Sequence, residues 1–225
     1  MAEWSSYSLS DLLLFSLQAY IGLFEPLNTT LWPAHLATLA LGLTVGLLVL
    51  KQGSVNNRLV WSMLGLLWIW TGSHFFFVQY AAINLAAGYI APVFWLQGLL
   101  FAWFAAAPKC PDIRYTGTAA GRTAMVLYLF ALIGYPAATL ALGRSLDSVE
   151  FIGISADPGV VATLAVLVLS HGSLTLLAWI VPLAWCALTG LTLWMLGSAE
   201  FFIAPLSGAM AVAATIAGRR VSQTQ

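Results

Sequence analysis

The sequence predicts an all-α membrane protein with seven transmembrane helices, an outer N-terminus and a cytoplasmic C-terminus, preceded by an amphipathic interfacial helix on the outer face. Of the 225 residues, 61% are hydrophobic and only 7% are charged, whereas soluble domains carry roughly 25% charged residues. So few charges cannot cover a soluble surface, and lipid must therefore cover most of it. The 10 Trp residues agree with this, because Trp favours the membrane–water interface.

The overall charge narrows the class of partner. The formal net charge is zero, so no nucleic-acid partner is expected. The apolar composition makes the lipid bilayer the expected partner. Cys110 and Cys186 are the two cysteines; they are expected at different depths, as free thiols rather than a disulfide. The sequence identifies no cofactor.

The first predicted helix covers residues 9–25, within an outer N-terminal segment at 1–30. Ser8 and Asp11 resemble a capping box. At about 100° per residue the polar residues of this segment fall in one narrow arc and the apolar residues cover the rest. That arrangement is typical of a helix lying in the plane of the interface. The helix is expected to end at Glu25-Pro26 and to pack on the rim of the bundle or against a partner.

Seven apolar segments follow in a transmembrane domain at residues 31–218, judged against the about 20 residues that a span needs. Asp157 as N-cap and Pro158 at the first helical position mark the start of the fifth segment, which is short, so whether it spans fully is left open. A cytoplasmic tail follows at 219–225. The predicted helices are 31–50, 59–81, 84–107, 122–142, 158–171, 173–196 and 199–218.

Basic residues decide the predicted orientation. With seven spans, the basic residues between helices one and two, between helices three and four, and after helix seven all fall on one side, which the positive-inside rule makes cytoplasmic. Most acidic residues fall on the other side, where Arg144 is the single basic exception. The basic residues of the cytoplasmic side are Lys51, Arg58, Lys109, Arg114, Arg122, Arg219 and Arg220.

Few ionisable residues are predicted inside the spans, and such residues are costly and often functional. His35, His74 and Glu200 are expected at similar depths near the outer face. Two imidazoles and a carboxylate can bind a divalent transition metal or relay protons, and two histidines can ligate a haem iron. Alternatively, the histidines are ordinary interfacial residues. His35 and His74 are the metal-ligand candidates.

Two further polar residues are candidates for a transport path. Thr71 lies on one helical face with Trp70 and His74, which predicts either a polar notch open to the outside or ordinary small-residue packing. Gln97 is expected near mid-membrane, where it must find a partner inside the protein because lipid offers none. Gln97 is expected either to form a hydrogen bond between helices or to contact a substrate.

Two pairs of small residues predict close helix contacts. Gly42 and Gly46 form one small-x-x-x-small pair, and Ala204 and Gly208 form a second, weaker one. Such pairs pack helices together inside one bundle or between chains. A homo-oligomer and partner membrane proteins therefore both stay open.

Two stretches carry a recognisable pattern. The first contains Leu9-Ser10-Asp11, Leu13-Leu14-Phe15-Ser16 and Leu31-Trp32-Pro33-Ala34-His35, and the second is Ala82-Ile83-Asn84-Leu85-Ala86-Ala87 with Gln97. Together they resemble a bacterial family of multi-pass membrane proteins of unknown function, except that Leu85 stands where Trp is expected. The resemblance implies a shared fold and no mechanism. We expect the protein in the cell inner (plasma) membrane.

Two functions stay open, and neither is enzymatic. The sequence has no Gly-rich phosphate loop and no Asp near mid-span for hydrolysis, so an enzyme is not expected. The first function is transport of a small solute, a proton or a metal ion. Its predicted site depends on whether His74, Gln97 and Glu200 face a common cavity, and the function loses that site if they do not. The second is an accessory or structural subunit of a larger membrane complex, without transport activity of its own.

Overall fold

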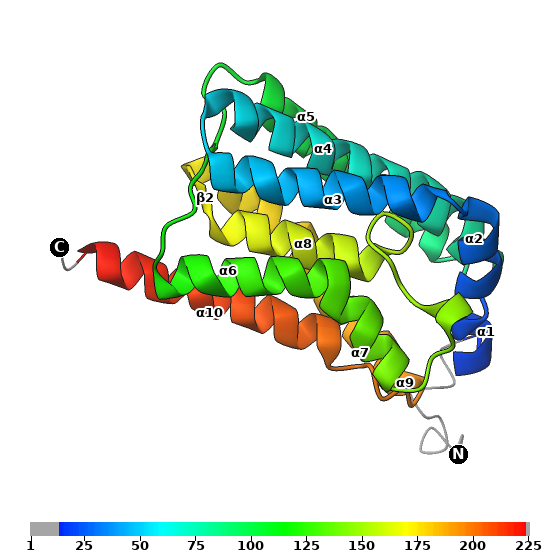
Figure 1. Ribbon diagram of the computed structural model, residues 1–225. Helices are drawn as coiled ribbons and strands as arrows, with labels where there is room; N and C mark the ends of the chain where they lie inside the picture. Colours follow the sequence, from blue (N-terminus) through cyan, green and yellow to red (C-terminus); the bar gives the residue numbers. More distant parts are fainter. Residues whose placement is uncertain (1–13, 224–225) are drawn as a thin grey trace, which may run out of the picture.

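The computed structural model describes residues 14–223, which form a bundle of helices (Figure 1). Part of the predicted interfacial helix, residues 9–13, lies outside the described residues. Three long helices make up one side of the bundle, a central helix runs beneath them, and further helices cover the opposite side. The three long helices are α3 (Ala34–Lys51), α4 (Ser54–Thr71) and α5 (Ala87–Ala106).

The remaining elements complete the chain in order. A π-helix, η3 (Gly72–Gln79), and a 3₁₀ turn, η4 (Tyr80–Ala82), extend α4, and a second π-helix, η5 (Phe130–Gly134), joins α6 to α7. Two short strands form an antiparallel ladder that pairs Asp112 with His171. The other elements are α1 (Leu17–Ile21), α2 (Phe24–Leu31), β1 (Asp112–Ile113), α6 (Ala119–Leu129), α7 (Tyr135–Ala141), η6 (Leu146–Ser148), α8 (Ala156–Val168), β2 (Ser170–His171), η7 (Ser173–Trp179), α9 (Ile180–Met195) and α10 (Ile203–Gln223).

The helix boundary predicted at Glu25-Pro26 is wrong. In the structure α1 ends at Ile21, and α2 begins at Phe24 and runs through Pro26 to Leu31. Pro26 is tolerated because it lies in the first helical turn, where its missing N–H would have no intrahelical partner. The next helix, α3, accordingly begins at Ala34 rather than at residue 31.

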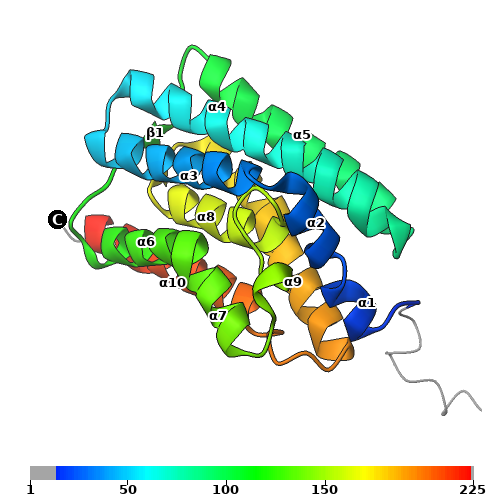
Figure 2. The ribbon, with the colours of Figure 1, turned by 45° about the vertical axis from the view of Figure 1, so that its right-hand side comes forward.

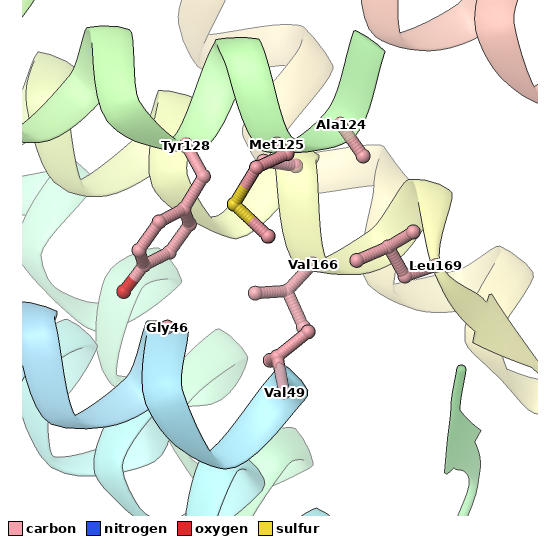
Figure 3. Close-up of a pocket in the computed structure, with 8 residues that line it drawn as sticks. Gly46, Val49, Ala124, Met125, Tyr128, Val166 and Leu169 are labelled. Carbon is pink, nitrogen blue, oxygen red and sulfur yellow. The ribbon is translucent and has the colours of Figure 1, made fainter. Parts of the chain in front are cut away.

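Gly42 and Gly46 of α3 face side chains of the segment that includes α6 and η5, with Leu132 against Gly42 and Tyr128 against Gly46 (Figure 3). A Cβ atom added to Gly46 would lie 3.1 Å from the ring of Tyr128. The Tyr128 hydroxyl donates a hydrogen bond to the Gly42 carbonyl, 2.6 Å away. The void beside this contact has a volume of about 10 Å³ and an apolar lining, so it leaves room for no ligand.

A tighter helix crossing occurs between α4 and α5, at a pair that sequence spacing did not single out. A Cβ atom on Gly65 would lie 2.9 Å from the Gly98 carbonyl oxygen, and one on Gly98 would lie 2.8 Å from the Gly65 oxygen. The two backbones therefore touch directly. The second predicted pair is looser, because a Cβ atom on Gly208 would meet Leu183 of α9 at an ordinary 3.4 Å.

The fifth predicted helix is the buried centre of the bundle. Every residue of α8 from Ala156 to Leu167 is buried, between α6, α9, α10 and α4. Its 13 residues rise about 20 Å, less than the roughly 30 Å of a hydrocarbon core. The predicted cap is wrong: Ser155 is the N-cap residue, and Asp157 directs its side chain into the bundle.

Successive long helices run in alternating directions, which gives the bundle two ends. One end, here called the acidic end, is formed by the loops 83–86, 142–155 and 196–202, together with α1 and α2 (Figure 2). The opposite, basic end is formed by the loops 52–53, 107–118 and 169–172. Within residues 14–223, five helical segments are long and apolar enough to cross a membrane, namely Ala34–Lys51, Ser54–Ala82, Ala87–Ala106, Ala119–Ala141 and Leu174–Met195. Two shorter apolar helices are Ala156–Val168 and Ile203–Arg219.

Candidate functional site

The three residues predicted to share an outer site have different partners in the structure. His35 Nε2 lies 3.1 Å from Asn28 Oδ1, and the His74 ring stacks on Trp70 at 5.1 Å between centroids. Glu200 is held by Arg144. Among residues 14–223, no three His, Cys, Asp or Glu side chains gather as metal ligands do. The three-ligand combination is therefore not formed, and metal binding by the two histidines stays a prediction.

Arg144 and Glu200 form a buried ion pair at the acidic end. The Arg144 side chain is 1% exposed and that of Glu200 is 5% exposed. Arg144 Nε donates to both Glu200 carboxylate oxygens, at 2.8 and 3.0 Å, and Nη2 donates to Oε2 at 2.6 Å. Nη1 donates to the Ser148 carbonyl oxygen. Because a carboxylate and a carbonyl oxygen accept hydrogen bonds from its N–H groups, the buried Arg144 guanidinium stays charged.

Glu150 is a second carboxylate beside the same guanidinium, and its burial is less well compensated by hydrogen bonds than that of Glu200. Its Oε1 lies 3.0 Å from Arg144 Nη2, but the geometry is not that of a hydrogen bond and no other partner satisfies this buried atom within the described residues. Burial raises the pKa of Glu150 to about 8; Arg144 lowers it, and Asp157 and Glu200 raise it. One guanidinium thus faces two carboxylates, and Glu150 is the one that can hold a proton near neutral pH.

Asp157 adds a third carboxylate at the start of the central helix. It accepts hydrogen bonds from the Tyr135 hydroxyl at 2.7 Å, from the Trp185 indole N–H at 2.6 Å and from the Thr189 hydroxyl at 3.2 Å. These donors come from α7 and α9, so the carboxylate connects three helices. Its position in the first turn of α8 is also favoured by the helix dipole.

The helices α1 and α2 cover this cluster. The Arg144 guanidinium carbon lies 4.7 Å from the centre of the Phe24 ring and 5.8 Å from that of Tyr20, within the range of cation–π contacts. The Asn28 amide donates to the carbonyl oxygens of Asp147 and Val149. Burial raises the pKa of Tyr20 well above its usual value, so its ring stays neutral. From residue 17 onwards the segment predicted to be amphipathic therefore covers the charged cluster as two helices, α1 and α2, and its place at a membrane interface stays a prediction.

The two mid-span candidates lie apart from this cluster. Gln97 is buried and donates from Nε2 to the Ala178 carbonyl oxygen, 3.0 Å away, which joins α5 to η7. Thr71 is buried at the end of α4. The Trp70 indole N–H bonds to the Gly153 carbonyl oxygen. Gln97 thus links α5 to η7. His74, Gln97 and Glu200 contact different neighbours, so they do not form the common site that was predicted for transport, and a carrier function needs a different site.

Sequence reasoning did not group Arg144, Glu150 and Asp157. One signal was available, because Arg144 is the single basic residue among the acids of that side. An isolated cation among acidic loops indicates an ion pair. The spacing of the partners gave no such signal, since Glu200 is 56 positions away in the chain.

A family model for a family of unknown function, DUF6064, matches residues 17–225. The chain belongs to this family. The match begins at the first residue of α1 and includes the whole charged cluster, which agrees with the resemblance to an uncharacterised family. No curated protein and no solved structure matches the chain.

Proposed function

We propose that this DUF6064 member crosses the inner (plasma) membrane seven times, with the acidic end outside and the basic end in the cytoplasm. The loops alternate between the two ends along the whole chain, and the β1–β2 ladder joins the loops that follow α5 and α8 at one end. That end also carries Lys51, Arg58, Lys109 and Arg114, which the positive-inside rule assigns to the cytoplasm. The short α8 crosses inside the bundle, enclosed by longer helices.

We further propose that the protein is a carrier of a small solute coupled to protons, with Glu150 as the proton-binding residue and Arg144, Glu200 and Asp157 as its neighbours. The observation that supports this is the excess of buried carboxylates over cations at Arg144. Ionisable residues in the interior of membrane proteins mark proton relays and ion paths. A buried carboxylate that has no cation of its own is stabilised when it binds a proton. Loss of that proton gives Glu150 a negative charge, which competes with Glu200 for Arg144.

A groove at the acidic end borders the residues that cover this cluster, and the four charged residues themselves do not line it. It has a volume of about 680 Å³ and runs between α2, α3 and η5–α7, within the roughly 300–1,000 Å³ of small-molecule sites. Its polar side chains are those of Asn28, Thr29, His35, Thr38 and Asp147. Asn28 and Asp147 also belong to the cover of the cluster, through the hydrogen bond between them. A mostly apolar lining favours a neutral or weakly polar solute.

Proteoliposomes with an entrapped pH indicator test the carrier function. Classes of solute (neutral amino acids, sugars, weak organic acids) are added outside, and the internal pH is followed. We expect one class to change the internal pH with the wild type and with Arg114→Gln, but not with Glu150→Gln. Arg114 is the matched control because its ion pair with Asp112 is exposed at the other end.

The opposite result would favour the accessory subunit. If no class moves protons, and native mass spectrometry of gently extracted protein finds a partner chain at fixed stoichiometry, the carrier proposal fails. In that case the cluster at Arg144 holds loops together and the exposed apolar helix faces cover the partner.

A further inference from the structure

The groove at the acidic end is organised around His35 of α3. Nε2 of this imidazole lies 3.1 Å from Oδ1 of Asn28 in α2, and the Asn28 amide donates to the Asp147 carbonyl oxygen at 2.8 Å. The centroid of the His35 ring lies 5.9 Å from that of Trp32 and 5.0 Å from that of Phe151. All five residues line the groove, so these contacts join α2, α3 and the loop after α7 into one wall.

The hydrogen bonds of Asn28 fix which nitrogen of His35 carries a proton. The Asn28 NH₂ group donates to the carbonyl oxygens of Asp147 and Val149, so its Oδ1 can only accept. The neutral imidazole of His35 therefore donates from Nε2, and Nδ1 carries a lone pair. Nδ1 is buried and has no hydrogen-bond partner within residues 14–223. Asn28 and His35 consequently offer no side-chain N–H group to a ligand of the groove.

The other polar side chains of the groove add acceptors and a negative charge. The hydroxyl groups of Thr29 and Thr38 each donate to a carbonyl oxygen of their own helix, which leaves their lone pairs for a ligand. Asp147 is exposed, and the ion pairs formed within residues 14–223 do not include it. No lysine or arginine is among the described residues that line the groove. Apart from the Trp32 indole N–H, the polar side chains of the lining therefore offer acceptors.

The apolar lining suits the body of a weakly polar solute, and these acceptors select the polar group that the solute carries. An ammonium group has three N–H donors and no acceptor, and its charge complements that of Asp147. The Trp32 ring, which is 64% exposed, also favours a cation, because the faces of aromatic rings attract cations. A carboxylate or phosphate would instead meet acceptors and the like charge of Asp147.

We propose that this groove binds a small organic amine in its ammonium form, with the ammonium group beside the Asp147 carboxylate and the hydrocarbon part on the apolar lining. This names the solute class of the proposed carrier, and the role of the bound amine in transport rests on that proposal. The binding itself does not, because Arg144, Glu150 and Glu200 are not among the lining residues.

Isothermal titration calorimetry on the full chain in nanodiscs tests the class of ligand, with empty nanodiscs as the reference for partitioning into lipid. The probes are phenethylamine, phenethyl alcohol and phenylacetate, which share a phenyl ring and differ in the polar group. We expect the amine to bind about fivefold or more tightly than the alcohol, and phenylacetate to bind most weakly. Equal affinities for all probes, or tightest binding of phenylacetate, would overturn the proposal.

Substitutions within the groove test the position of the amine. Asp147→Asn should weaken amine binding by about fivefold or more, whereas Asp112→Asn, the same change at the basic end, should leave it unchanged. Trp32→Leu should weaken amine binding by about two- to fivefold. Trp194→Leu should not, since Trp194 is similarly exposed but does not line the groove. Amine binding that is insensitive to both Asp147→Asn and Trp32→Leu would overturn the proposal.

This proposal and the carrier proposal can fail separately. Glu150→Gln should bind the amine as the wild type does, because Glu150 is not among the lining residues. If the amine binds as expected and no solute moves protons in proteoliposomes, the carrier is overturned and the amine site stands. If another class of solute moves protons and the amine does not bind, the carrier stands and the amine site is overturned.

Discussion

The two ends of this bundle each hold an arginine–carboxylate pair, in opposite surroundings. Arg144 and Glu200 have side chains 1% and 5% exposed, whereas Arg114 and Asp112 have side chains 65% and 35% exposed. Water screens the second pair and supplies other partners for both groups. The first pair depends entirely on protein groups, namely Ser148, the rings of Phe24 and Tyr20, and Glu150.

This difference in burial sets how much each charge depends on its partners. An ion pair at the surface contributes about 0–1 kcal/mol to the free energy of unfolding, so its substitution has little effect. A buried ion pair has a large desolvation cost that is offset only by complete hydrogen bonding. At Arg144 the compensation is complete for Glu200 and incomplete for Glu150. The incompletely compensated carboxylate is the feature that a purely structural ion pair does not need.

Removal of the two arginines should give the largest contrast. Arg144→Leu leaves Glu150 and Glu200 buried without a cation, and we expect a loss of about 3–5 kcal/mol in the free energy of unfolding. Arg114→Leu should change it by less than about 0.5 kcal/mol. Denaturant unfolding in mild detergent, followed by Trp fluorescence, measures both. Equal losses would show that burial does not distinguish the two pairs.

The pH dependence of stability should distinguish the two ends next. The unfolded chain releases the Glu150 proton near pH 4.3, whereas the folded protein holds it up to about pH 8. Between these values the folded state binds more protons, so the free energy of unfolding falls as pH rises, by up to about 1.4 kcal/mol per pH unit. Melting temperatures from pH 5 to 8 measure the slope. Glu150→Gln should flatten it and Asp112→Asn should not; an unchanged slope in Glu150→Gln would contradict the assignment.

Asp157→Asn tests the part of the acidic end that lies against the central helix. The amide places an NH₂ group against donors from Tyr135, Trp185 or Thr189, and we expect a loss of about 1–3 kcal/mol. Asp147→Asn, in the neighbouring loop, is the control and should have little effect. The same unfolding measurement applies, and a neutral Asp157→Asn would mean that the three hydrogen bonds contribute little.

Asn28→Ala should have the most local effect. It removes two hydrogen bonds from α2 to the loop beneath it and the contact between Asn28 Oδ1 and His35 Nε2, and hydrogen bonds of this kind contribute about 0.5–1.5 kcal/mol each. We expect faster amide hydrogen exchange in α1, α2 and residues 142–155, with no change in residues 107–118. Thr29→Ala is the neighbouring control, because its hydroxyl bonds only within α2. Faster exchange over the whole chain would indicate general destabilisation instead.

Sequence patterns predicted the apolar helices well because period and hydropathy are local properties. The segments expected at 84–107 and 173–196 are found at 87–106 and 173–195, in α5 and in η7–α9. The break at Glu25-Pro26 was misplaced because a proline is compatible with a first helical turn. The Gly65–Gly98 crossing was also missed, since it depends on which helices meet and not on spacing within one helix.

The charged cluster was much harder to predict than the helices. His35, His74 and Glu200 were grouped by estimated depth, but depth does not determine the direction of a side chain around its helix. Glu200 lies in the α9–α10 loop and meets a loop residue, Arg144, instead. Asp157 looked like a helix cap because caps are local, whereas its three partners lie on other helices.

Infrared titration of the carboxyl groups tests most directly whether Glu150 carries an exchangeable proton inside the bundle. Wild type and Glu150→Gln are compared from pH 5 to 10 in detergent or nanodiscs, with Asp112→Asn as the control. We predict a protonated-carboxyl band that persists at neutral pH, disappears with a midpoint near 8, is absent in Glu150→Gln and is unchanged in Asp112→Asn. A band lost below pH 6, or one unaltered in Glu150→Gln, would contradict the account.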